Sequence, residues 1–348
     1  MIPQAASANA GTPLMWAGIF HLVLGNFLIG LGEGILIATV FKRPKVRCVG
    51  LMIAANYFSA WVGGVWLAGN IATKLDWHLY NAWNLFWLFA LGSYLGTLIL
   101  EFSIVAICFW KSEHWFKRSI QASLLVQTIS YVCLFGWYWG ASGKSLYTRM
   151  NVVQPSEIRL PENLQLYYIS SQDGHVHQGS QIVGNVISTN RSDRLLIKPR
   201  DGETNRWELA MRFDARRDED VKVTTVLSLI ESLSTSAEPV EENRPNGSDT
   251  WFNFGEAITM GETNGRNWEI WTGFWPVEGM RIKNSKTDKE YRFAWETLFS
   301  RWTIRNAILL PDDKVIFQLG DDQICIVEPA SRKIALLAKG RGPAAVLK

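Results

Sequence analysis

Two glutamates, Glu33 and Glu101, lie inside apolar stretches that are long enough to cross a membrane. A carboxylate at membrane depth is costly, so such a residue commonly marks an ion, proton or substrate site. Residues three, four or seven apart share a helix face, and this spacing adds further polar side chains to each candidate face. The resulting set of candidate site residues is Glu33, Glu101, Asn56, Gln127, Asn26, Ser59, Tyr94 and Thr97.

Charged residues at the ends of the apolar stretches place four of these side chains at one depth. Glu33 lies nine residues before Lys42, Asn56 nine after Arg47, Glu101 ten before Lys111, and Gln127 nine after Arg118. At 1.5 Å per residue, all four lie roughly 13–15 Å from the same edge, near the middle of a hydrocarbon core about 30 Å thick. Because unpaired polar groups are costly in hydrocarbon, we expect these faces to meet inside a helical bundle.

Three interpretations of this polar interior remain open. Carboxylates together with amide oxygens suit a hard cation such as Na⁺, Ca²⁺ or Mg²⁺, and they also suit a proton relay. Alternatively, protonated glutamates simply hold helices together, or the site recognises another membrane component. The pattern selects no particular metal or cofactor.

The small-residue pairs Gly30/Gly34 and Gly92/Gly96 permit close helix approach.

His21 is the only histidine within an apolar stretch, and no second histidine at its depth could complete a haem site. On a straight α-helix, its separation of twelve residues from Glu33 places it about 120° away around the axis. We therefore interpret His21 as an interface or packing residue outside the polar face.

The hydropathy pattern predicts a membrane protein, in which a four-span helical bundle precedes a mainly-β soluble domain. The expected order is a tail at 1–12, spans at about 13–41, 48–72, 79–110 and 119–141, a linker at 142–155 and a β-rich domain at 156–348. The tail has no Lys or Arg, unlike the start of a cleavable signal peptide, so the first span is expected to be retained.

The distribution of Lys and Arg predicts the orientation of the spans. The first and third loops carry seven, at Lys42, Arg43, Lys45, Arg47, Lys111, Lys117 and Arg118, whereas the opposite side carries four, at Lys74, Lys144, Arg149 and Arg159. Because cytoplasmic loops are enriched in Lys and Arg, both termini and the β-rich domain are expected on the non-cytoplasmic side of a plasma or inner membrane.

The second half changes to the two-residue alternation of β-strands. Strands are expected at 166–170, 193–198, 206–213 and 268–275, and a three-strand meander at 314–338. Residues 223–233 fit a helix or a buried strand, and residues 234–250 form a polar loop. Many short strands favour a β-sandwich or a propeller-like stack.

The sequence contains no catalytic motif that we can identify, so an enzyme is disfavoured. A net charge of +3 gives no argument for nucleic acid, and the four cysteines lack metal-ligand spacing. We expect a multi-pass membrane protein that presents an extracytoplasmic β-domain for binding or assembly of a partner. The alternative is an ion- or proton-coupled transporter or channel subunit. Expected partners are the lipid bilayer and either a membrane protein or a second copy of the chain.

Overall fold

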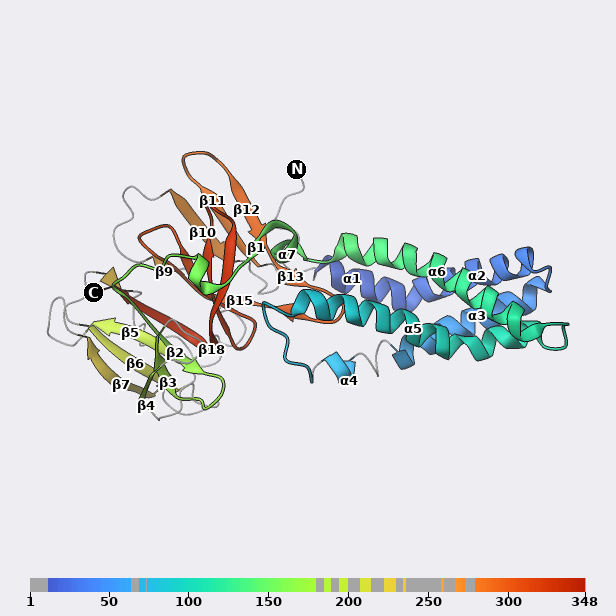
Figure 1. The fold of residues 1–348 in the computed structure, drawn as a ribbon, viewed down its shortest axis with the longest axis horizontal. Coiled ribbons are helices and arrows are strands. Elements are labelled where there is room, and N and C mark those ends of the chain that lie inside the picture. The colour runs from blue at the N-terminus through green and yellow to red at the C-terminus, as the bar shows by residue number, and fades with distance from the viewer. Residues whose placement is uncertain are drawn as a thin grey trace. The chain divides into compact units, whose positions relative to one another are not determined.

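The computed structural model describes residues 12–63, 69–72, 74–179, 185–188, 194–199, 207–213, 222–229, 234–235, 258–259, 267–272 and 279–347. The chain forms two compact units: residues 1–142 with Glu296–Ser300, and Gly143–Trp295 with Arg301–Lys348. The first contains four helices long and apolar enough to span a membrane, and the second is mostly antiparallel β-sheet (Figure 1). This order of a helical part followed by a β-rich part confirms the coarse prediction.

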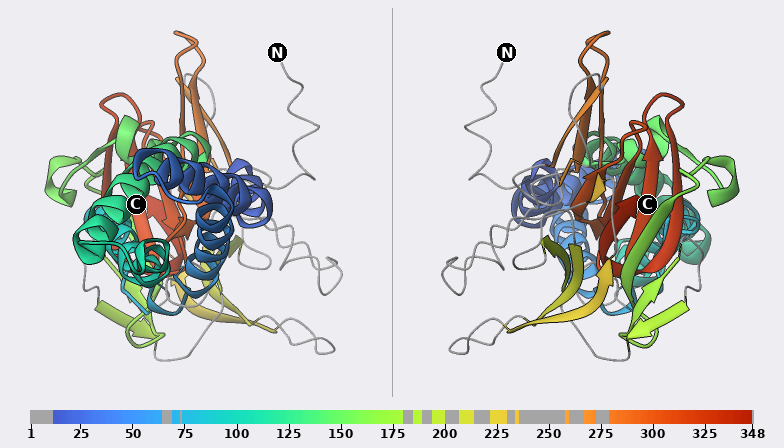
Figure 2. Two further views of the ribbon diagram at one scale, coloured as in Figure 1. Left: turned by 90° about the vertical axis from the view of Figure 1, so that its right-hand side faces the viewer. Right: turned by 90° about the vertical axis from the view of Figure 1, so that its left-hand side faces the viewer.

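The four long helices lie alongside one another, as the end-on view in Figure 2 shows. The first joins α1 (Pro13–Phe20), a π-helical segment η2 (His21–Gly25) and α2 (Asn26–Val40). The second is α3 (Lys45–Ser59), which continues as π-helix over residues 60–63. The third and fourth are α5 (Ala82–Phe109) and α6 (Trp115–Ala141), and α4 (Gly69–Ala72) is a separate short helix. Residues 64–68 lie outside the described part of the chain, so the bounds of the span expected at 48–72 stay a prediction.

Two arginines connect the loops at the basic end of the bundle. The Nε of Arg43 donates to the carbonyl of Cys108 at 3.0 Å, and Arg47 donates to the carbonyl of Ile107 at 2.9 Å. The last carbonyls of a helix have no intrahelical partner, and a cation there also complements the helix dipole. These contacts stabilise the end of α5 and hold the α2–α3 loop beside it.

Two glycines bring α2 into backbone contact with α3. A Cβ on Gly30 would lie 2.5 Å from the Cα of Ile53, and a Cβ on Gly34 would lie 2.4 Å from the Cα of Val49. The expected close approach at Gly30/Gly34 is therefore present. A Cβ on Gly92 or Gly96 would meet nothing within 4 Å, so this second pair makes no such contact.

The second unit begins with α7 (Ser145–Arg149) and contains a ten-stranded sheet. Along the sheet the order is β4-β3-β2-β18-β17-β16-β15-β9, and β1 and β8 also pair with β18. The members are β1 (Asn151–Val152), β2 (Leu164–Ser170), β3 (Val176–Gln178), β4 (Asn185–Ser188), β8 (Ser234–Thr235), β9 (Ile258–Thr259), β15 (Ile304–Leu309), β16 (Val315–Leu319), β17 (Gln323–Glu328) and β18 (Lys333–Leu347). The antiparallel pairing of β16, β17 and β18 confirms the meander expected at 314–338.

Three smaller sheets complete this unit. They comprise β5 (Arg194–Pro199), β6 (Trp207–Phe213) and β7 (Lys222–Leu229); β10 (Trp268–Thr272), β11 (Met280–Asn284) and β12 (Glu290–Phe293); and β13 (Trp295–Glu296) with β14 (Arg301–Trp302). Within the segment 223–233, for which the sequence leaves a helix or a strand open, residues 223–229 belong to strand β7, and residues 230–233 lie outside the described part of the chain. Of the polar loop expected at 234–250, residues 236–250 lie outside the described part of the chain.

Alternation along β2 places the two faces of the ten-stranded sheet in different cores. Leu166 and Tyr168 belong to one core with β15, β16, β17 and β18. Tyr167 and Ile169 belong to a second core that includes Leu209 of β6. Because successive side chains of a strand point to opposite faces, β2 is buried on both sides.

Candidate functional site

Glu33 on α2 receives hydrogen bonds from two other helices. The Nδ2 of Asn56 on α3 donates to its Oε2 at 2.6 Å, and the Oγ of Ser130 on α6 donates to its Oε1 at 2.5 Å. Glu33 is only 4% exposed. Its two oxygens therefore join α2 to α3 and to α6 inside the bundle.

Glu101 on α5 also accepts one hydrogen bond from an amide and one from a serine, but here the serine is on α3 and the amide is on α6. The Oγ of Ser59 on α3 donates to its Oε1 at 2.5 Å, and the Nε2 of Gln127 on α6 donates to its Oε2 at 2.5 Å. Glu101 is 1% exposed. We refer to Glu33, Asn56, Ser59, Glu101, Gln127 and Ser130 as the carboxyl layer.

The carboxyl layer is built from a repeated pattern. A glutamate on one helix of each hairpin is followed, on the next long helix, by an amide residue and a serine three positions later: Asn56 and Ser59 on α3, Gln127 and Ser130 on α6. Each amide bonds the glutamate of its own hairpin, and each serine bonds the glutamate of the other. The layer therefore has approximate two-fold equivalence about the long axis of the bundle.

Every hydrogen-bond donor to the two carboxyl groups is neutral. They are two amides and two serine hydroxyls, and no salt bridge to either glutamate occurs in the part of the chain that the structure describes. An amide NH₂ can only donate, whereas a serine hydroxyl can donate to a carboxylate or accept from a carboxylic acid. Each glutamate therefore has partners for its ionised and its protonated form without movement of heavy atoms.

Three of the predicted site residues lie beside the carboxyl layer and do not bond it. Thr97 is joined to Tyr131 at 2.7 Å, and Tyr94 is joined to Thr128 at 3.0 Å, so both pairs connect α5 to α6. Asn26 is 1% exposed and donates to the carbonyl of Leu22 in its own helix at 3.4 Å. Glu33, Asn56, Ser59, Glu101 and Gln127 are the predicted residues that the structure brings together.

His21 begins the π-helical segment η2 and packs against another helix, as its interpretation as a packing residue predicts. A π-helical turn holds more residues than an α-helical turn, so the angle of about 120° to Glu33 that a straight α-helix gives does not apply here. His21 faces a neighbouring helix: its Nδ1 lies 2.6 Å from the Oη of Tyr138 on α6, and the two rings meet edge to face. Hydropathy gives no signal for a π-helical turn, so the sequence analysis did not predict the contact with Tyr138.

Ser130 is the other residue that sequence analysis omitted from the candidate site. Its signal was present, because Ser130 stands three residues after Gln127 as Ser59 stands three after Asn56. Ser123, one turn earlier on α6, is 3% exposed, and its Oγ has no hydrogen-bond partner among the described residues.

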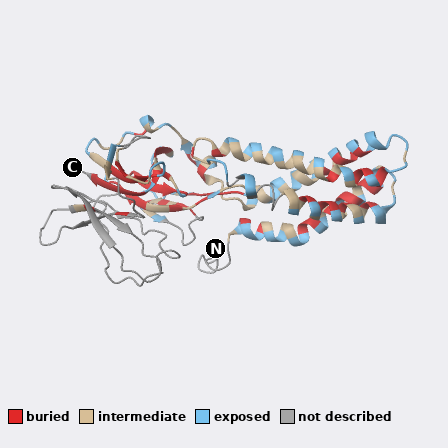
Figure 3. Cartoon of the chain, turned by 90° about the horizontal axis from the view of Figure 1, so that it is seen from below, coloured by how far each residue is buried: buried red, intermediate tan, exposed pale blue. Residues whose placement is uncertain are grey.

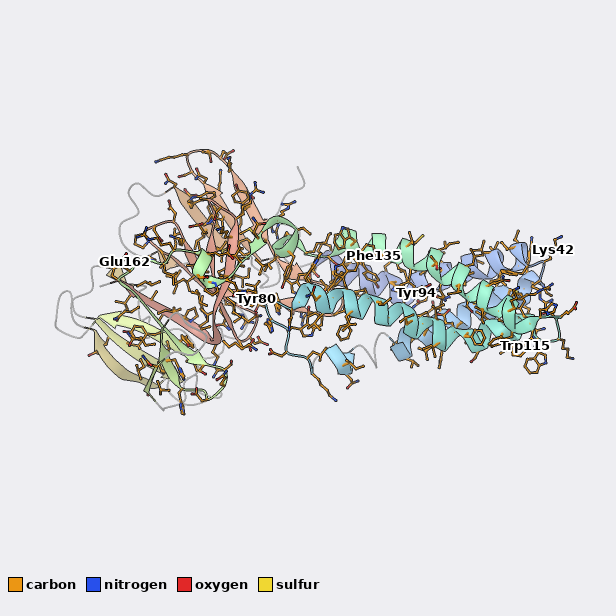
Figure 4. The ribbon with its side chains drawn as sticks, viewed as in Figure 1. Lys42, Tyr80, Tyr94, Trp115, Phe135 and Glu162 are labelled. Atoms are coloured by element: carbon orange, nitrogen blue, oxygen red, sulfur yellow. The ribbon has the colours of Figure 1, made fainter. Side chains whose placement is uncertain are left out.

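The bundle is packed differently on the two sides of the carboxyl layer. The basic half, toward the loops at Lys42 and Trp115 (Figure 4), comprises residues 34–40, 45–55, 102–109 and 115–126. Its core of ten buried residues includes Met52, Val105 and Val126, each fully buried. The hydroxyl half comprises residues 13–32, 82–100 and 128–141. Within it, no described residue of 83–100 or 128–141 is buried, and Figure 3 shows this contrast along the helices.

The residue types around the carboxyl layer also limit its chemistry. Among the described residues, no group of three or more His, Cys, Asp or Glu side chains could hold a metal ion. The layer offers carboxyl, amide and hydroxyl groups, which bind protons and form hydrogen bonds and whose oxygens also suit a hard cation. No protein-family model, no curated protein and no solved structure matches the chain.

Proposed function

We propose that this chain is a multi-pass membrane protein whose helical bundle binds protons reversibly at Glu33 and Glu101. The observation that carries the proposal is the pairing of each carboxyl group with one amide and one serine hydroxyl. A serine rotates its hydroxyl between donating and accepting, so either protonation state keeps two hydrogen bonds. A proton-coupled transport or channel function follows from such a site.

Charge balance supports a positively charged ligand, for which we propose the proton. Two ionised carboxylates in a low-dielectric interior need compensating positive charge, because an uncompensated charge in hydrocarbon is expensive. The donors to Glu33 and Glu101 supply none. A purely structural layer would keep both groups protonated at every pH, whereas a functional one exchanges its protons.

The expected orientation places the basic half toward the cytoplasm. Lys and Arg gather on the loops at 42–47 and 111–118, and these loops are adjacent because Arg43 bonds Cys108. Exposed aromatics at the same end, Trp110 and Trp115, suit the membrane–water interface. We propose a plasma or inner membrane location with both termini on the non-cytoplasmic side.

Infrared spectroscopy of the protein in lipid nanodiscs tests proton binding. The wild type is expected to show a carboxylic-acid C=O band whose intensity changes with pH. The Glu33→Gln and Glu101→Gln variants each lose part of this band, and the double variant loses it entirely. Glu113→Gln, at an exposed loop position, is the matched control and leaves it unchanged. A band that stays constant with pH would show that the layer is only structural.

A second candidate function concerns the β-rich unit, which we propose to be a sandwich-like module that binds a partner protein. Trp271 on β10 is 42% exposed, and the guanidinium of Arg281 lies 5.4 Å from its ring centroid. Trp and Arg are enriched among residues that dominate protein interfaces. Cross-linking in intact cells should give a defined product that Trp271→Ala loses. Val186→Ala, at another exposed position, should retain it.

A further inference from the structure

We propose that protons reach the carboxyl layer from one side only, through the hydroxyl half, and that the His21–Tyr138 pair is the relay at the entrance of this route. This inference rests on the proposed proton-binding function and adds the direction of exchange and two further functional residues. It is carried by the geometry of His21, by the polar groups between it and Glu33, and by the packing of the basic half.

The His21–Tyr138 pair is held in a specific geometry. The Nδ1 of His21 and the Oη of Tyr138 are 2.6 Å apart, although the residues belong to different helices. Gly25 makes space for the imidazole, because a Cβ there would lie 3.0 Å from the Cδ2 of His21. The π-helical segment that aims His21 is a rare structure that is frequent at functional sites.

Polar side chains continue from this pair toward the carboxyl layer. Tyr131 lies seven residues before Tyr138 on α6, on the same helix face, and bonds Thr97. Ser130, which immediately precedes Tyr131 in the sequence, donates to Glu33. On the first long helix, Asn26 stands between His21 and Glu33. Seven residues of helix span about 10 Å, a gap that a few water molecules bridge.

The basic half offers no comparable route. Between the carboxyl layer and the loops lies the core that contains Met52, Val105, Phe109 and Val126, all with 0% exposure. Ser119 donates to the carbonyl of Trp115 in its own helix. Ser123 is the remaining buried hydroxyl on this face of α6 and has no partner to pass a proton to within the described chain. A dry apolar layer of this kind excludes both water and protons.

The proposed step moves one proton and no electrons. A proton from water binds one nitrogen of the His21 imidazole while the other nitrogen releases one to the Tyr138 hydroxyl. That hydroxyl passes its own proton to water, and water delivers a proton to the Glu33 carboxylate, either directly or through Ser130, whose oxygen accepts a proton from water as its hydroxyl releases one. The titratable groups along the route are His21, Tyr138, Tyr131 and the two glutamates, and Tyr94 lies at its side.

The test separates the rate of proton exchange from its equilibrium. The full-length protein in nanodiscs is subjected to a pH jump, and the carboxylic-acid band is followed over time. His21→Asn and Tyr138→Phe are expected to slow the change about 100-fold, the scale of a lost acid–base relay. The final band at each pH should equal that of the wild type. Added imidazole should partly restore the rate in His21→Ala. Ser123→Ala is the control in the basic half and should match the wild type.

The outcomes distinguish this inference from the proposed function. Unchanged rates in both His21→Asn and Tyr138→Phe, or slowing by Ser123→Ala, would overturn the one-sided route while leaving proton binding intact. The absence of any pH-dependent band in the wild type would instead refute proton binding itself. A circular dichroism spectrum and an equilibrium band like those of the wild type exclude misfolding as the cause of a slow variant.

Discussion

The two halves of the helical bundle contain the same helices but differ in how they are packed. In the basic half, Gly34 lets α2 and α3 touch through their backbones, and a core of ten buried residues fills the interior. In the hydroxyl half, α3 gives way to π-helix at residues 60–63, and hydroxyl pairs such as Thr97–Tyr131 connect α5 to α6. The carboxyl layer lies at the boundary.

This difference shows why the glutamates lie where they do. A carboxyl group placed within the apolar core of the basic half would have no hydrogen-bond partner and no exchange with water. At the boundary, Glu33 and Glu101 have partners from α3 and α6, and the adjacent half supplies hydroxyl groups. In the proposed route, the basic half excludes water and the hydroxyl half gives protons access to the carboxyl layer.

The largest expected contrast between the halves is in access to water. In a background with all native cysteines replaced, Thr97→Cys in the hydroxyl half should react with a hydrophilic thiol reagent in proteoliposomes. Val105→Cys lies about as far from Glu101 on the same helix, but in the closed core, and should not react. Mass spectrometry of the labelled protein reports both. Equal labelling at the two positions would remove the basis of the comparison.

The next largest effect concerns the layer itself. Glu101→Ala leaves the Ser59 and Gln127 donors buried without an acceptor, at a cost of about 1–3 kcal/mol for each donor. Glu101→Gln keeps an acceptor oxygen and should cost much less. Unfolding titrations in mixed detergent micelles measure both. If Glu101→Ala were as stable as Glu101→Gln, the layer would not contribute to holding the helices together.

A smaller effect is expected where α2 touches α3. Gly34→Ala introduces a methyl group that would lie 2.4 Å from a backbone atom, and overpacking of this kind costs about 1–3 kcal/mol. Gly96→Ala, in the hydroxyl half, meets nothing within 4 Å and should leave stability unchanged. Thermal unfolding in one detergent compares the two. The close contact would be disproved by equal melting temperatures.

The smallest effect is expected for a single hydroxyl. Tyr131→Phe removes the hydrogen bond to Thr97, and such bonds between membrane helices contribute about 0.6 kcal/mol on average. The variant should therefore fold almost normally. The same unfolding titration measures this variant. A decrease in unfolding free energy as large as that of Glu101→Ala would mean that the hydroxyl half is as tightly packed as the basic half.

Sequence alone predicted the features that follow from helix length, periodicity and charge. The charged loop residues fixed the ends of the helices, and the 3.6-residue period then placed Glu33, Asn56, Glu101 and Gln127 at one depth. The structure joins these residues by hydrogen bonds, while their proposed role in proton binding stays a prediction. The final meander followed from its turn residues and two-residue alternation.

The remaining features depend on interactions that have no local signal. A π-helical turn depends on tertiary packing, so the position of His21 could not be derived from a uniform 100° step. Gly30/Gly34 and Gly92/Gly96 have the same spacing, yet only the first pair meets another helix, because a small-residue pair permits contact without requiring it.

The exchange of serines between the two hairpins has a consequence for biosynthesis. Glu33 is synthesised in the same hairpin as its partner Asn56, but its second partner, Ser130, follows only with the last long helix. Ser59 likewise gains its acceptor only once Glu101 has been made. A chain that ends before α6 therefore leaves Glu33 without Ser130 and Glu101 without Gln127, so only the last long helix completes the layer.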